Sequence, residues 1–201
     1  QQAELGDLAS LTGGRMAGVF DGAVVHTPVV VTERAMQLVR ELKPDGVVAI
    51  GAGAATGLSK AIALRTDLPQ LIVPTSYAGS EMTPVLGETV DGVKTTQSSP
   101  NILPEAVIYD VNLTLSMPAK FSAISGLNAI AHAAEALYAR DGNPITSLMA
   151  EEAIAKLASS LPEVIDRPRD LDARSDALYG RLLYTSSSPR DRPRSRMPSS
   201  A

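Results

Sequence analysis

The segment DGVVAIGAGAATGLSKAIAL, residues 45–64, is the most informative stretch of this 201-residue chain. It begins with GVVAI (46–50), a continuous apolar run typical of a strand that is buried on both faces of a sheet. Small residues with three glycines follow at 51–57, and apolar residues then return at helical spacing from Leu58. The segment therefore predicts a strand, a tight glycine-rich turn and a helix.

The residues on both sides continue the alternation of strands and helices. Met16–Phe20 is predicted as a strand, and a helix is predicted from Thr27-Pro28 to the stop signal at 43–46. Leu71–Val73 is predicted as the strand that follows the central helix. This order indicates an α/β fold with a parallel sheet and crossover helices.

Two other patterns follow the predicted sheet. Residues 85–96 predict a β-hairpin with a type I′ turn at Asp91-Gly92, and Ala106–Tyr109 predicts another short strand. After Pro118 the pattern becomes helical. The predicted helices occupy 118–124, 125–139, 145–160 and 171–180.

We therefore expect three parts: an incomplete α/β domain at 1–115, the start of a helical domain at 116–180, and a tail at 181–201. The tail, RLLYTSSSPRDRPRSRMPSSA, has six Ser, three Pro and five Arg, a composition that predicts disorder. Its net charge is +4, whereas residues 1–180 carry −8.

The composition excludes several classes of protein. The chain has no Trp, two Phe and five Tyr, which disfavours a surface that stacks nucleic-acid bases. It has no Cys, so disulfide frameworks, thiolate metal sites and cysteine nucleophiles are excluded. No apolar run reaches the ~20 residues that a membrane span needs. We expect neither a nucleic-acid nor a membrane partner, and a cytoplasmic location.

Two loops are candidate binding sites, because each follows a predicted strand and ligands bind at the carboxyl edge of open α/β sheets. The first is the glycine-rich turn at 51–57, where free N–H groups at a helix start suit a phosphate. The second, PTSYAGSEMTP (74–84), supplies hydroxyls. An ordinary connection between a strand and the next element explains each loop as well as a binding role does.

The segment SGLNAIAHAAE (125–135) is a third candidate. Asn128 and His132 lie four residues apart on a predicted helix, so both project from one face, with Glu135 nearby. Such a pair suits half of a metal site or an acid–base or orienting pair. A purely structural role explains His132 as well, and the same holds for His26. Lys60 and Lys94 are explained equally by ordinary solvent-exposed lysines.

Four ordered segments resemble the iron-containing alcohol dehydrogenase superfamily and, within it, the maleylacetate reductases. They are DGVVAIGAGAATGLSKAIAL (45–64), PTSYAGSEMTPV (74–85), ILPEAVIYDVNLTLSMP (102–118) and SGLNAIAHAAEALYA (125–139). The resemblance covers about Met16 to Gly180. It implies a dehydroquinate-synthase-like fold, in which a nucleotide-binding α/β domain precedes a helical domain.

The resemblance also implies roles for individual residues. Gly51, Ala52, Gly53 and Ala54 would hold the diphosphate of NADH or NADPH. The same cofactor cleft would be lined by Thr75, Ser76, Gly79 and Ser80, with Lys94 nearby. Asn128 and His132 would be the catalytic residues, Asn128 orienting or polarising the substrate and His132 donating to it or positioning it.

The chain also departs from the superfamily. A serine of the usual diphosphate loop is Ala54 here, and Gly57 replaces an aspartate that is common in alcohol dehydrogenases. Asn128 stands where alcohol dehydrogenases have a metal-binding aspartate, and a neutral amide is a poor ligand for a divalent cation. We therefore expect no metal requirement. His132 would be a metal ligand only if the chain is a metal-dependent alcohol dehydrogenase.

The activity implied is NAD(P)H-dependent reduction of the C=C bond of maleylacetate, a dicarboxylate, to 3-oxoadipate in the degradation of aromatic compounds. Alternatives are a metal-dependent alcohol dehydrogenase and a non-catalytic nucleotide-binding fragment. The full-length family is expected to be homodimeric. Because the resemblance stops after Gly180, we expect a chain truncated at both ends whose residues 181–201 are not native.

Overall fold

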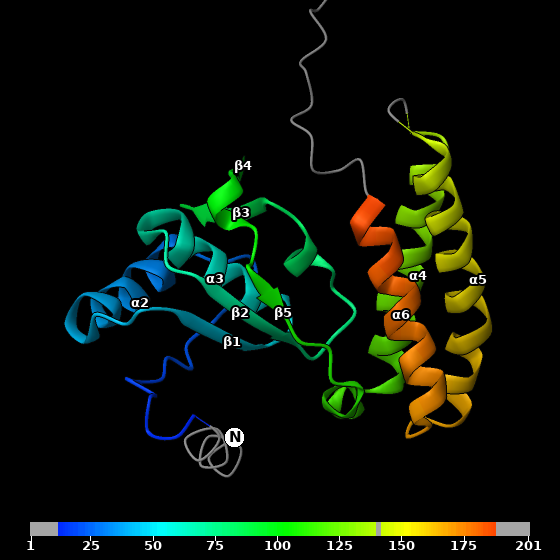
Figure 1. The fold of residues 1–201 in the computed structure, drawn as a ribbon, viewed down its shortest axis with the longest axis horizontal. Helices are drawn as coiled ribbons and strands as arrows, with labels where there is room; N and C mark the ends of the chain where they lie inside the picture. Colours follow the sequence, from blue (N-terminus) through cyan, green and yellow to red (C-terminus); the bar gives the residue numbers. More distant parts are fainter. Residues whose placement is uncertain (1–11, 140–141, 188–201) are drawn as a thin grey trace, which may run out of the picture.

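The computed structural model describes residues 12–139 and 142–187. Strands β1 (Val47–Gly51), β2 (Gln70–Pro74) and β5 (Ala106–Val107) form a parallel sheet in the order β1-β2-β5. Its register pairs Val47 with Gln70 and Leu71 with Ala106. Helix α3 (Gly53–Thr66) connects β1 to β2 and packs on both strands, with α2 (Val29–Leu42) against it (Figure 1). The predicted α/β fold is confirmed.

The predicted burial of the first strand on both faces is wrong. Ala49 is buried, whereas Val48 and Ile50 on the other face are 57% and 37% exposed. Helix α3 covers one face only, which gives β1 the in–out alternation of a half-buried strand. The strand predicted at Met16–Phe20 is also wrong, because these residues form no ladder with any strand in the described part of the chain. Phe20 instead packs beside α2 and α3.

The hairpin prediction is confirmed. Strands β3 (Val85–Val90) and β4 (Val93–Ser98) pair antiparallel. The turn residues Asp91 and Gly92 both have positive φ, 49° and 79°, as a type I′ turn requires. Short 3₁₀ turns, η1 (Ser80–Met82), η2 (Pro100–Ile102) and η3 (Val111–Ser116), connect the strands and lead to the helices.

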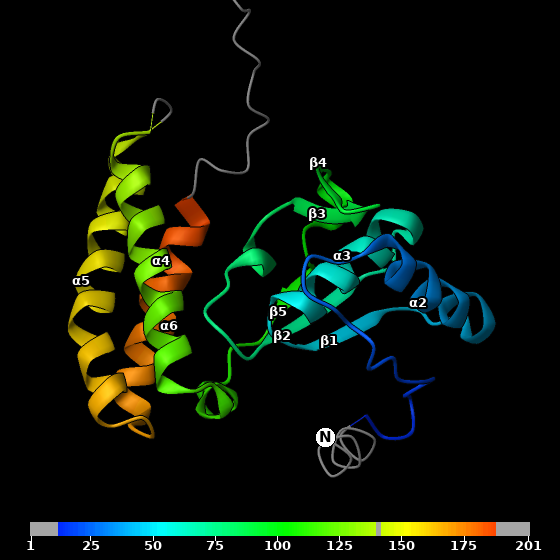
Figure 2. The same ribbon diagram turned by 180° about the vertical axis from the view of Figure 1, so that it is seen from behind.

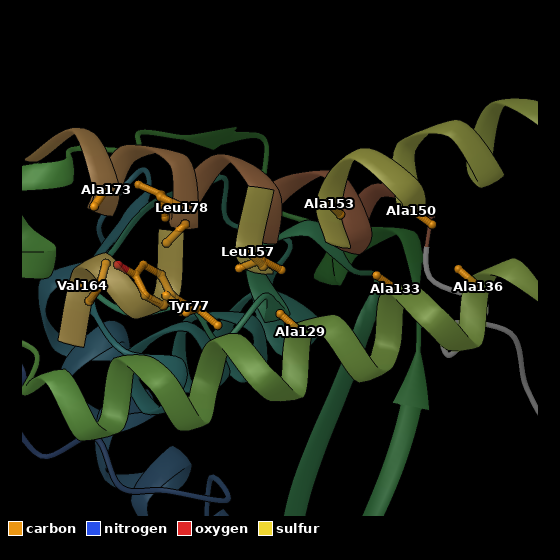
Figure 3. Packing of buried hydrophobic residues seen from close by; sticks show 12 residues of the cluster. Tyr77, Ala129, Ala133, Ala136, Ala150, Ala153, Leu157, Val164, Ala173 and Leu178 are labelled. Carbon is orange, nitrogen blue, oxygen red and sulfur yellow. The ribbon is translucent and has the colours of Figure 1, made fainter. Parts of the chain in front are cut away.

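The C-terminal part is a bundle of α4 (Ala119–Leu137), α5 (Pro144–Asp166) and α6 (Leu171–Ser187), which lies beside the sheet in both views (Figures 1 and 2). Small residues dominate its core: Ala129, Ala133 and Ala153 are fully buried around Leu157 (Figure 3). The structure has one helix where two were predicted, at 118–124 and 125–139. No helix in the described ranges is long and apolar enough to cross a membrane.

The predicted disorder from Arg181 is wrong for residues 181–187, because α6 continues to Ser187. Arg181 is fully buried and forms an ion pair with buried Glu81 of η1. The Arg- and Ser-rich composition of the segment contained no sign of this burial. The rest of the predicted tail, 188–201, lies outside the described residues.

Gly126 lies where α4 and α5 approach closely. A Cβ built on Gly126 would lie 2.7 Å from Cδ1 and 3.0 Å from Cγ of Leu161. We expect Gly126→Val to lower the free energy of unfolding by about 2 kcal/mol through overpacking. Urea denaturation of Gly126→Val, Leu161→Ala and the double variant measures this. If the two losses simply add, the proposed clash is contradicted.

Candidate functional site

The turn between β1 and α3 is shaped by Gly51 and Ala52. Gly51 has φ 151°, a backbone conformation that residues other than glycine rarely adopt. Its carbonyl accepts a hydrogen bond from the N–H of Thr75 at 3.0 Å. Ala52 is the N-cap of α3, and no side chain caps this helix. The first turn of α3 carries no acidic residue. The helix therefore presents backbone N–H donors and a partial positive charge to whatever lies before it.

The loop after β2 lies beside this helix start, as the parallel pairing of β1 and β2 requires. Thr75 and Ser76 line a cleft of about 380 Å³ together with Ala52. The opposite wall is formed by η3 and the first two turns of α4. Its lining residues are Ser116, Met117, Pro118, Phe121 and Ser125.

The chemistry of the cleft combines apolar surface with hydroxyls and a helix N-terminus. None of its lining residues in the described structure carries a charge. An anionic group is therefore best placed at the start of α3, and a planar apolar group beside Met117 and Phe121. This arrangement suits a ligand that joins a diphosphate to rings.

The structure brings together only some of the residues predicted to bind a cofactor. Ala52, Thr75 and Ser76 line the cleft, and Gly51, Gly53 and Ala54 form the adjoining turn and the start of α3. The remaining predicted residues are not in the cleft lining of the described chain. They are Gly79, Ser80 and Lys94.

These three residues occupy other places. Gly79, with φ 90°, is the N-cap of η1, and the carbonyl of Ser80 accepts from Lys60. Lys94 lies on the hairpin and lines a separate hollow with His26 and Thr89. Its predicted role beside the cofactor stays a prediction.

Asn128 and His132 both lie on α4 but differ in burial. Asn128 is exposed, one turn beyond Ser125 of the cleft wall. His132 is only 6% exposed, and its Nδ1 lies 3.2 Å from Oε2 of Glu135, which confirms the expected proximity of these two. Neither residue lines the cleft of the described structure.

A metal ion has no complete set of protein ligands in the described residues. Among residues 12–139 and 142–187, no three His, Cys, Asp or Glu side chains gather as a metal site would require. Asn128 adds only an exposed amide. These residues therefore do not fit a resident divalent cation by themselves.

Sequence reasoning missed the burial of two cations, Lys60 and Arg174. Lys60 is 1% exposed and not solvated; its Nζ donates to the carbonyls of Thr83 (2.5 Å), Val85 (2.9 Å) and Ser80. Arg174 on α6 is also 1% exposed. Their partners are mainly backbone carbonyls distant in sequence, so no local pattern marks these residues.

A third buried cation joins the sheet part to the bundle. Arg181 contacts Glu81, and its Nη1 donates to the hydroxyl of Tyr109 at 3.3 Å. That hydroxyl in turn donates to Glu81 at 2.9 Å. Burial, followed by the negative charge of Glu81, raises the pKa of Tyr109 well above its ordinary value, so the phenol is neutral at physiological pH.

Gly57 packs against Thr27, whose Oγ1 would lie too close to a Cβ built on Gly57. Thr27 is 4% exposed and held at φ 45°. We expect Gly57→Asp to lower the unfolding free energy by about 2 kcal/mol, through this clash and a half-buried carboxylate. Thermal denaturation of Gly57→Asp with and without Thr27→Ala measures it. Unchanged stability of the single variant would refute the close packing.

Both parts of the chain match profiles of the same protein family. A family profile described as iron-containing alcohol dehydrogenase matches residues 5–111, and the C-terminal profile of that family matches 122–187. The second match extends beyond Gly180, where the resemblance was expected to stop.

Individual relatives agree with these matches. The maleylacetate reductase of Rhizobium sp. (strain MTP-10005) is 56% identical over 183 residues, 91% of this chain and 52% of the relative. The crystal structure of maleylacetate reductase from the same strain superposes with a TM-score of 0.89, covering 94% of this chain and 54% of the other. Sulfoacetaldehyde reductase from Bifidobacterium kashiwanohense in complex with NAD+ has a TM-score of 0.88 at 25% identity, covering 92% of this chain and 55% of the other. The chain spans about half the length of the relatives that it matches.

Proposed function

Because the chain belongs to the iron-containing alcohol dehydrogenase family, we propose that it forms the nucleotide-binding part of a maleylacetate reductase. The reaction proposed is NAD(P)H-dependent reduction of the C=C bond of maleylacetate to 3-oxoadipate. The 56% identity to a maleylacetate reductase supports this substrate, and the relative in complex with NAD+ supports the cofactor. The domain limits 1–115 and 116–180, a homodimer and a cytoplasmic location are part of the same proposal.

One observation carries the nucleotide part of the proposal. The N-terminus of α3 has no side-chain cap and no acid in its first turn, and it opens on a cleft lined by Ala52, Thr75 and Ser76. A helix start of this kind holds a diphosphate through backbone N–H groups and the helix dipole. The Thr75 and Ser76 hydroxyls supply further donors and acceptors beside it.

The reduction needs hydrogen-bond donors at the ketone oxygen of the substrate, where negative charge develops. Bound NAD(P)H would supply a hydride to one carbon of the C=C bond, the electron pair would move towards the ketone oxygen, and a proton added to the other carbon would complete the reduction. We assign Asn128 to orient or polarise the substrate, since its exposed amide lies one turn from the cleft wall. His132, braced by Glu135, is assigned to donate to the substrate or to position it. A substitution series, Asn128→Ala and His132→Ala, tests these roles by kcat.

We also propose that the reaction requires no metal. The neutral amide of Asn128 supports it, whereas the iron in the family's name does not. We expect exhaustive treatment with a chelator to leave NADH oxidation by the full-length Rhizobium relative within twofold of the untreated enzyme. Metal analysis accompanies the assay. Activity that disappears with the metal and returns with iron supports the metal-dependent alcohol dehydrogenase instead, with His132 as a ligand.

The experiment for this chain is an assay of NADH oxidation with maleylacetate, together with an NADH titration. Binding with turnover supports the reductase. Binding without turnover supports the alternative of a non-catalytic nucleotide-binding fragment. Absence of binding contradicts the nucleotide site in this chain.

A further inference from the structure

Both walls of the cleft are fixed to the same part of the helical bundle, at α6. Tyr77 follows Thr75 and Ser76 in one wall, yet its ring is 1% exposed and lies within the bundle core beside Val164 and Leu178 (Figure 3). The loop that lines the cleft therefore inserts a side chain into the opposite part of the molecule. Tyr77 thereby ties this wall of the cleft to the core of the bundle.

The second wall is held by Arg174. Its Nη1 donates to the carbonyl of Thr114 at 2.6 Å and to Oγ of Ser122 at 3.4 Å, and its Nη2 donates to the carbonyl of Met117 at 3.0 Å. Nε donates to the carbonyl of Pro168 at 2.6 Å. The planar guanidinium thus joins η3, the start of α4 and the turn before α6.

The two anchors are neighbours. Burial raises the pKa of Tyr77 above its ordinary value, while the positive charge of nearby Arg174 opposes this shift. Tyr77 is therefore a neutral phenol beside a buried cation. The buried guanidinium of Arg174 has three carbonyls and one hydroxyl as its acceptors, and losing any of them would leave part of a buried charge without a partner. All four hydrogen bonds therefore favour one arrangement of the walls.

We propose that Arg174 and Tyr77 are positioning residues that set the separation of the cleft walls, and thereby the affinity for the nucleotide. This inference rests on the proposed function, because it takes the cleft to be the nucleotide site. Arg174 acts through Thr114 and Met117, and Tyr77 acts through the loop that contains Thr75 and Ser76.

The test compares NADH affinity, measured by fluorescence titration well below the melting temperature of each variant. We expect Arg174→Met to raise Kd at least tenfold and Arg174→Lys, which keeps the charge and a donor, to raise it no more than threefold. The matched control is Arg65→Met, which removes a half-buried arginine paired with Glu88 away from the cleft and should leave Kd within twofold. An Arg174→Met variant with unchanged Kd overturns the proposal. If that variant does not fold, Tyr77→Leu takes its place with the same expectation.

A second measurement separates this inference from the proposed function. The chain has no cysteine, so spin labels can be attached at Lys120→Cys on α4 and Arg40→Cys on α2 without side reactions. We expect Arg174→Met to broaden or shift the distance distribution between the labels, and Arg65→Met to leave it unchanged. An unchanged distribution in Arg174→Met overturns the positioning role. If the unmodified chain binds no NADH while the distribution still changes, the nucleotide site fails and the control of wall separation stands.

Discussion

Lys60→Met is expected to lower the free energy of unfolding by about 3 kcal/mol. Methionine fills the space of the lysine stem but donates no hydrogen bond. The carbonyls of Ser80, Thr83 and Val85 then lose a shared donor while remaining partly buried, and each unsatisfied group costs about 1–3 kcal/mol. Urea denaturation followed by circular dichroism measures the loss.

The control for this substitution is Lys156→Met. Lys156 pairs with Asp176 at 3.0 Å on the surface of the bundle, where an ion pair contributes little. We expect this variant to unfold close to the unmodified chain. If Lys60→Met loses no more stability than Lys156→Met, the carbonyl cage around Lys60 does not hold α3 to the loop at 80–85.

Ala52→Glu is expected to weaken NADH binding by about 10- to 100-fold without loss of stability. The new carboxylate stands at the N-terminus of α3, where it repels a diphosphate, and like-charge contacts at a binding surface cost several kcal/mol. The same carboxylate interacts favourably with the helix dipole, so the melting temperature should stay the same or rise. This opposite effect on binding and on stability distinguishes a lost site from a damaged fold.

Ala52→Gln is the matched variant, because it has nearly the same size and no charge. We expect its Kd to lie much closer to that of the unmodified chain. Equal weakening by Gln and Glu would mean that bulk and not charge is responsible, and would contradict the placement of a diphosphate at α3. Affinity unchanged in both variants would place the nucleotide elsewhere.

The sequence predicts the centre of the fold well because local signals and tertiary structure agree there. The apolar run at 46–50, Gly51 and the Asp91-Gly92 turn determine backbone conformation directly. The carboxyl edge of a parallel sheet then brings Ala52 to Thr75 and Ser76 without further information. One wall of the candidate site follows from topology alone.

The other wall and its supports depend on contacts between distant segments. Nothing near Phe121 or Arg174 in the sequence indicates that the bundle packs against the loop at 75–80. The half-exposed β1 and the burial of Arg181 depend in the same way on which faces other segments cover. Composition predicted disorder from Arg181, whereas the ion pair with Glu81 and the continuation of α6 give residues 181–187 a structure.

We propose that the dinucleotide lies between the start of α3 and the N-terminal turns of α4. Backbone amide NMR of the 21.0 kDa chain during an NADH titration tests it most directly. We expect the largest saturable shifts at Gly53, Ala54, Thr75, Ser76 and Ser125. Shifts confined to the hollow of His26 and Lys94, or no saturable shifts at all, would contradict the account.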